Sequence, residues 1–150
     1  MLHDAVLSAH VVAGAAGLLV GPLAGAASGR GLHPTAGWIY QGCTAVLCTT
    51  AFVLAVMDPA LWGFAVIAVA TQAAAAGSVV VRRRRRPGWR PLHAQLAIGS
   101  YISFVTAFVV QSAGGLWWVV PVALGSAVTS TVAGRLKRAE QRLRPTPAGA

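Results

Sequence analysis

The chain has 150 residues, 56% of them hydrophobic and only 10% charged, and it carries a formal net charge of +9. An average soluble domain has about a quarter of its residues charged, because it must cover an apolar core with a polar surface. This composition excludes an ordinary soluble fold and indicates an integral membrane protein, of a length that fits one domain.

Five apolar stretches, each ended by a breaker-rich or charged segment, follow one another along the chain. A helix needs roughly 20 apolar residues to cross about 30 Å of hydrocarbon. We therefore predict an all-α helical membrane bundle of five transmembrane helices, at about 5–27, 35–57, 60–81, 92–113 and 116–133. In this prediction residues 1–134 form the bundle, and residues 135–150 form a basic cytoplasmic tail that is disordered.

The Lys and Arg residues all lie outside these stretches, and with five helices they fall on one side of the membrane. The positive-inside rule places that side in the cytoplasm, so the N-terminus is expected outside and the C-terminus inside. We predict a multi-pass protein of the plasma membrane. The run of arginines from Arg82 to Arg86 is expected to contact anionic lipid headgroups, and its placement argues against nucleic acid as a partner.

Glycines recur every four residues on the first predicted helix, at Gly17, Gly21 and Gly25. Within a bilayer, small residues at this spacing allow two helices to approach closely, so the stripe predicts a helix-packing face. Faces rich in Gly and Ala also allow for another membrane protein, or a second copy of this chain, as a partner.

Histidines stand at the starts of the second and fourth predicted helices, His33 and His93. Both helices run in the same direction, so the two side chains enter the membrane at the same depth. Facing imidazoles on two helices can ligate haem or a transition metal, which makes this pair the candidate cofactor or metal site. Second-shell side chains are expected on the same helix faces, at Tyr40, Ser100 and Tyr101.

Three further polar side chains are expected inside the bundle, because polar groups in contact with lipid are costly. These are His10 on the first helix, Gln72 on the third and Gln111 on the fourth. His10 and Gln111 lie at similar depths near the outer surface, so we expect Gln111 to be able to hydrogen-bond His10. His10 lies too far outward to share a metal ion with His33, by roughly 25 Å at 1.5 Å per residue.

The motifs that open the second and fourth helices are His33-x3-Gly37-x2-Tyr40 and His93-x7-Tyr101. They resemble those of a family of small, largely uncharacterised bacterial membrane proteins, with His-Arg-x-x-Gly-x-x-Tyr and His-x-x-Trp-Met-x-Arg-Ser-Tyr at these places. The resemblance covers about residues 5–105, and it extends to the first helix through His10, Gly14, Gly21 and Pro22. It implies a multi-helix bundle in a bacterial inner membrane, without a settled activity. The layout is also similar to that of b-type haem membrane cytochromes.

This chain departs from the family pattern at Pro34, Leu96 and Gly99. The family has arginines where Pro34 and Gly99 stand here. If those arginines bind an anionic group such as a haem propionate, this chain lacks them, and Arg90 or the 82–86 run would have to substitute. A member that has lost its ligand is the other reading of these departures.

Three functions remain open from the sequence. The first is a membrane redox or electron-transfer protein that holds haem b, or else a metal, between His33 and His93. The second is a non-enzymatic structural or accessory subunit, and the third is a small carrier whose polar path is lined by His10, Gln72 and Gln111. Hydrolytic chemistry is disfavoured because no predicted span contains a carboxylate and no Gly-x-Ser-x-Gly or phosphate-binding loop occurs. Whether the chain is an enzyme is left open.

Overall fold

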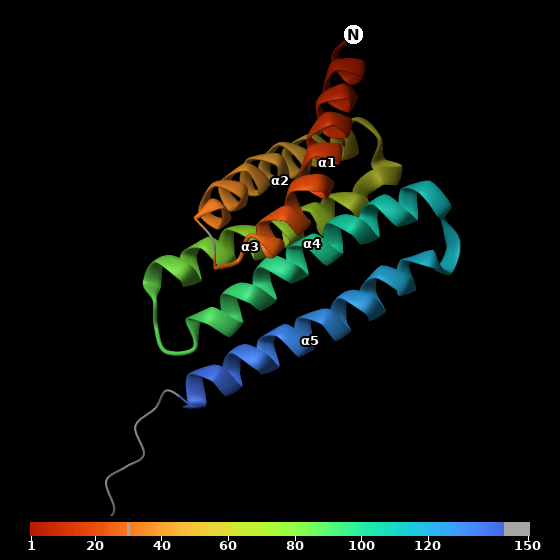
Figure 1. Ribbon diagram of the computed structural model, residues 1–150. Coiled ribbons are helices and arrows are strands. Elements are labelled where there is room, and N and C mark those ends of the chain that lie inside the picture. Colours follow the sequence, from red (N-terminus) through yellow and green to blue (C-terminus); the bar gives the residue numbers. More distant parts are fainter. Residues whose placement is uncertain (30, 143–150) are drawn as a thin grey trace, which may run out of the picture.

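The computed structural model describes residues 1–29 and 31–142. The long elements of this part of the chain are all α-helices (Figure 1). In chain order they are α1 (Leu2–Ala26), α2 (Leu32–Met57), α3 (Trp62–Arg84), α4 (Trp89–Ala113) and α5 (Val119–Arg142). Two short 3-10 helices, η1 (Pro59–Leu61) and η2 (Gly115–Trp118), precede α3 and α5.

All five long helices have the length and apolar composition needed to cross a membrane. Mean hydropathy over their most apolar windows ranges from 1.5 to 2.0, and each candidate span covers at least 25 residues. Large apolar side chains lie on the outside of the bundle, for example Leu19 at 71% exposure and Leu124 at 65%. Such a surface fits lipid rather than water, so the predicted all-α membrane bundle with five spans is confirmed as a fold.

The helix boundaries follow the predicted ones closely except at α5. The sequence predicted an end at about residue 133, whereas α5 continues to Arg142. Residues 135–142 read RLKRAEQR, which are almost all strong helix formers, and basic side chains suit the negative end of the helix dipole. The helix therefore includes the first half of the segment predicted as a disordered tail, and residues 143–150 of that prediction lie outside the described residues.

The turns between helices are short, and capping or glycine residues shape them. Asp58 accepts a hydrogen bond from the backbone nitrogen of Ala60 at 3.0 Å, and Pro59 follows it at the first helical position. Gly88 and Gly114 have φ angles of +77° and +64°, which a residue with a side chain rarely adopts. These residues end one helix and redirect the chain into the next, so consecutive helices pack as antiparallel neighbours.

Helices pack mainly on their neighbours in sequence, and α1 additionally touches α4. In Figure 1, α1 is tilted against the other four helices, and α5 lies along the lower edge of the bundle beside α4. The interior is built from small side chains, such as Thr44, Ala55, Ala75 and Ser100, each at most 1% exposed. Close approach of small residues is the normal way in which helices associate within a bilayer.

Two of the three predicted packing glycines account for the contact between α1 and α4. A Cβ atom placed on Gly17 would lie 2.8 Å from Phe104 Cζ, and one placed on Gly21 would lie 2.5 Å from Tyr101 Cδ2. Gly25 differs, because nothing lies within 4 Å of its would-be Cβ. The packing face of α1 therefore includes Gly17 and Gly21 and stops before Gly25, near the end of the helix.

Candidate functional site

The structure brings His33 and His93 together. His33 lies in the first turn of α2 and His93 follows the first turn of α4, and both side chains are half-buried. Their ring centroids are 6.2 Å apart, with an angle of 82° between the ring planes. Two histidines 60 positions apart in sequence thus face each other at one end of the bundle.

A backbone carbonyl of α1 fixes the imidazole of His33. His33 Nδ1 lies 2.8 Å from the oxygen of Ala24. The backbone nitrogen of Ser28, the helical partner that this oxygen would have, bonds to Gly25 instead, which leaves the Ala24 carbonyl available. A carbonyl oxygen only accepts, so Nδ1 of His33 carries the proton and donates it.

The second hairpin repeats this arrangement. His93 Nδ1 lies 2.9 Å from the backbone oxygen of Ser78, near the end of α3, and donates to it in the same way. Each histidine therefore joins the start of its own helix to the end of the preceding one. Among the described residues, neither Nε2 has a hydrogen-bond partner, so in the neutral ring each carries a free lone pair.

A polar layer lies about two helical turns deeper. Tyr40 and Ser100 each follow the histidine of their helix by seven positions, roughly 10 Å along the axis. The Tyr40 hydroxyl lies 3.2 Å from Ser100 Oγ, which itself donates to the Ala97 carbonyl at 2.8 Å. Tyr40 is therefore the donor in this pair. The equal offsets show that α2 and α4 run parallel and in register.

The predicted second-shell residues thus form a layer below the histidines rather than direct partners of them. Tyr101 donates its hydroxyl to the backbone oxygen of Leu18 in α1 at 3.0 Å. Within the described part of the chain, no hydrogen bond links Tyr40, Ser100 or Tyr101 to either histidine. Their positions are compatible with support of a group bound above them, and that role stays a prediction.

Trp89 lies beside the histidine pair, and two arginine–tryptophan contacts occur at the same end of the bundle. The Trp89 ring lies 6.3 Å from the His93 ring, and the Arg90 guanidinium lies 5.7 Å above Trp89. On the neighbouring helices, the Arg83 guanidinium lies 5.6 Å from the Trp38 ring. This end of the bundle therefore combines two imidazoles with cations that can neutralise an anionic group.

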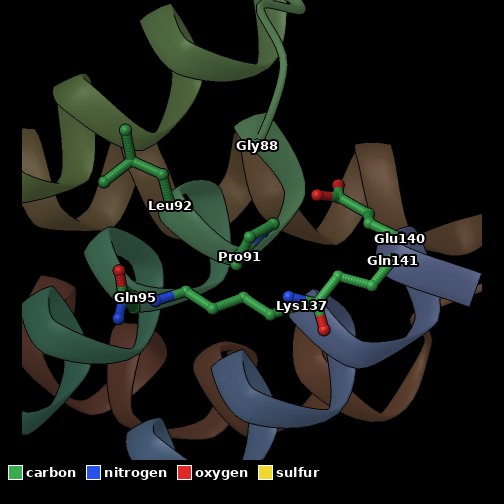
Figure 2. A pocket seen from close by; sticks show the side chains of 7 residues that line it. All are labelled: Gly88, Pro91, Leu92, Gln95, Lys137, Glu140 and Gln141. Carbon is green, nitrogen blue, oxygen red and sulfur yellow. The ribbon is translucent and has the colours of Figure 1, made fainter. Parts of the chain in front are cut away.

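A separate cavity of about 240 Å³ lies at the same end, between the start of α4 and the last turns of α5 (Figure 2). Figure 2 shows Lys137 reaching from α5 towards Gln95 of α4. Neither histidine borders this cavity, whose lining is Gly88, Pro91, Leu92, Gln95, Lys137, Glu140 and Gln141. It is a surface cavity with both apolar and polar lining residues, distinct from the histidine pair.

The other three predicted polar residues, His10, Gln72 and Gln111, do not contact one another. His10 Nδ1 lies 3.0 Å from the Thr50 hydroxyl, and that hydroxyl donates to the backbone of its own helix, so His10 is the donor. The predicted partner of His10, Gln111, is exposed at the end of α4. The buried side-chain oxygen of Gln72 has no hydrogen-bond partner among the described residues. These three side chains give no continuous polar path for a carrier within the described structure.

Sequence reasoning missed the carbonyls of Ala24 and Ser78 and the aromatic neighbour of His93. Backbone carbonyls leave no signal in a sequence, because every residue has one. Trp89 had a signal, since it precedes His93 by four positions and so shares its helix face.

These observations define the class of protein as a multi-pass α-helical membrane protein with a histidine pair at one end of its bundle. Comparisons with family models, with curated proteins and with solved structures found no match.

Proposed function

We propose that this chain is a membrane electron-transfer protein in which His33 and His93 would hold a haem b. The observation that carries the proposal is the facing pair of imidazoles whose Nδ1 atoms are both held by backbone carbonyls. A ligating histidine commonly donates its other ring nitrogen to a carbonyl, which fixes the tautomer and the ring orientation.

The spacing of the rings fits two ligands on one iron. Two imidazoles that would hold one ion between them have centroids roughly 6 Å apart, because each metal–nitrogen bond is about 2 Å long. The rings of His33 and His93 are 6.2 Å apart. Their free Nε2 atoms supply the neutral nitrogen donors that iron accepts in haem proteins.

The donor set favours haem over a bare metal ion. A protein site for a bare transition metal usually has three or four side-chain ligands. The described residues contain no group of three or more His, Cys, Asp or Glu side chains that could hold a metal. A haem brings most of its iron ligands with it, so His33 and His93 would be enough to hold it, and a bound haem would supply one-electron chemistry.

The other residues of this end have roles consistent with the proposal. The layer of Tyr40 and Ser100 limits the depth to which water can enter from the basic end, because both side chains are buried. Arg83 and Arg90 would provide positive charge for the carboxylates of a bound haem, in the place of the arginines that the resembled family has where Pro34 and Gly99 stand here. We further propose that this end faces the cytoplasm, because it contains the run from Arg82 to Arg86.

The absorption spectrum of the purified protein tests the proposal. Protein made in haem-replete cells is expected to show a Soret band, and His33→Ala or His93→Ala is expected to abolish it. His10→Ala is the matched control, because His10 bonds Thr50 between α1 and α2 and is not part of the pair. Wild-type protein without bound haem would refute the proposal.

A structural or accessory subunit is the second candidate function, and the same histidines favour it. Each imidazole joins two consecutive helices through one hydrogen bond, which is a stabilising role that needs no cofactor. In this case the wild-type protein has no Soret band, and both alanine variants lower the melting temperature of the bundle.

A further inference from the structure

The cavity of about 240 Å³ between α4 and α5 contains one side chain of each charge. Lys137 and Glu140 stand three positions apart on α5, a spacing at which opposite charges on a helix surface can pair. Within the described residues they form no ion pair with each other, and neither has another ionic or hydrogen-bond partner. In Figure 2 the Glu140 carboxylate turns towards the start of α4 near Gly88, whereas Lys137 extends the other way, towards Gln95. The cavity thus holds a cation and an anion apart from each other.

This cavity lies at the level of lipid headgroups. Counted from Val119, the start of α5, Lys137 and Glu140 lie roughly 27 and 32 Å along the helix axis, at 1.5 Å per residue. The hydrocarbon of a bilayer is about 30 Å thick, and a headgroup layer follows on each side. The groups that meet the cavity in a membrane are therefore the headgroups of phospholipids.

The size and the lining of the cavity favour a small headgroup. A pocket for a whole drug-sized molecule has a volume of roughly 300–1,000 Å³. The smaller volume here fits a headgroup whose acyl chains remain outside. None of the described residues that line the cavity is aromatic. The methylated ammonium of choline is typically held by aromatic faces, so the lining disfavours a choline headgroup.

We propose that the cavity between α4 and α5 binds the headgroup of phosphatidylethanolamine. Its phosphate is negative and can pair with Lys137, and the Gln95 amide can donate a further hydrogen bond to it. Its primary ammonium has three N–H donors, which suit the Glu140 carboxylate at the other end of the cavity. A zwitterion of this kind satisfies both charges at once, whereas an anionic headgroup satisfies only Lys137 and is repelled by Glu140.

This site is separate from the arginine run of the same end. The residues from Arg82 to Arg86 do not border the cavity, and their expected contacts with anionic lipids depend on charge alone. The cavity instead joins α4 to α5, the helix that packs only on α4 and its adjoining turn. A headgroup bound between Gln95 and Lys137 is therefore expected to hold the end of α5 against α4.

Titration of the delipidated protein, followed by native mass spectrometry, tests the site. Phosphatidylethanolamine, phosphatidylglycerol and phosphatidylcholine with the same acyl chains are compared. The wild type is expected to bind phosphatidylethanolamine at least about tenfold more tightly than the other two, the effect of one charge-assisted hydrogen bond.

Two variants separate the roles of the two charges. Glu140→Gln is expected to remove the preference for phosphatidylethanolamine over phosphatidylglycerol, because the group that binds the ammonium and repels an anion is lost. Lys137→Gln is expected to weaken the binding of both lipids roughly tenfold, since the phosphate loses its cation. Arg138→Gln is the matched control, because it removes the same charge from the adjacent residue, which does not line the cavity. It should bind phosphatidylethanolamine like the wild type.

Hydrogen exchange locates the bound lipid. Addition of phosphatidylethanolamine to the wild type in phosphatidylcholine nanodiscs is expected to slow exchange around Lys137, at the end of α5. Exchange in the turn at Asp58, at the other end of the bundle, should stay the same. Glu140→Gln should lose the added protection.

Three results would overturn the proposal. They are equal binding of the three lipids by the wild type, a wild-type preference for phosphatidylglycerol, and equal binding of phosphatidylethanolamine by Lys137→Gln and Arg138→Gln. The second result would show that the basic end attracts lipid by net charge alone. None of these results bears on the Soret band of the histidine pair, so the headgroup site and the proposed function are tested independently.

Discussion

At the residue scale, the close approach of α1 to α4 depends on the absence of a side chain at Gly21. The ring of Tyr101 occupies the space that a Cβ atom would need, and the Tyr101 hydroxyl bonds the backbone of α1 at Leu18. One glycine therefore allows both the ring contact and the hydrogen bond. Gly25 lies one turn further along the same helix and has open space around it.

This difference gives a matched pair of variants. Gly21→Leu is expected to destabilise the bundle by about 1–3 kcal/mol, the usual cost of an overpacked interior. Gly25→Leu, the same substitution on the same helix, is expected to leave stability nearly unchanged. Thermal unfolding in detergent measures both, and equal melting temperatures would show that the Gly21 contact does not hold α1 in place.

At the element scale, α5 is the helix with the fewest neighbours. It packs on α4 and the adjoining turn, and Ala133 is the one residue of its described part that is fully buried. Gly125 makes its closest approach, where a Cβ atom would fall within 2.5 Å of the Ile102 side chain. The remainder of α5 presents its apolar surface outward.

We expect Gly125→Leu to separate α5 from α4 without unfolding the other four helices. Hydrogen exchange should then speed up along α5 while the amides of α2 and α4 remain protected. Ala127→Leu is the control, because Ala127 is exposed. Loss of protection throughout the bundle in Gly125→Leu would contradict a peripheral α5.

Comparison of particular residues shows how much of this arrangement could be predicted from the sequence. The meeting of His33 and His93 follows from span lengths, because alternating helices of similar length place the starts of α2 and α4 at the same end. The partner of His10 could not be predicted this way. Counting residues along the helices places His10 and Gln111 at the same depth in the membrane, but it does not show which helices are neighbours. In the structure α1 packs on α2, so His10 bonds a residue of α2.

The end of α5 shows a second limit. Its apolar stretch stops near Ala133, and apolar length was the signal used to place the helix end. Helix formation needs no apolar residues, however, so the basic segment that follows continues the helix to Arg142. The length of an apolar stretch therefore predicts the membrane-crossing part of a helix better than it predicts where the helix ends.

At the scale of the whole molecule, the arrangement of charge gives a prediction of topology. The arginine run that ends α3 and the basic end of α5 lie at the same end of an antiparallel bundle. Reporter fusions are expected to place a tag after residue 142 in the cytoplasm and a tag in the turn at Asp58 outside. A tag after residue 142 that is accessible from outside would contradict the orientation, because the positive-inside rule would then be reversed.

The central claim, that the histidine pair binds haem rather than only joining helices, is tested most directly by the absorption spectra of His33→Asn and His93→Asn. The asparagine amide nitrogen can replace Nδ1 as the donor to the Ala24 or Ser78 carbonyl, but no nitrogen remains at the Nε2 position. We therefore expect both variants to fold, to lack the Soret band of the wild type and to melt like wild-type protein from which haem has been removed, since bound haem itself stabilises the folded state. A wild type with no Soret band, or asparagine variants whose spectra equal that of the wild type, would contradict the account.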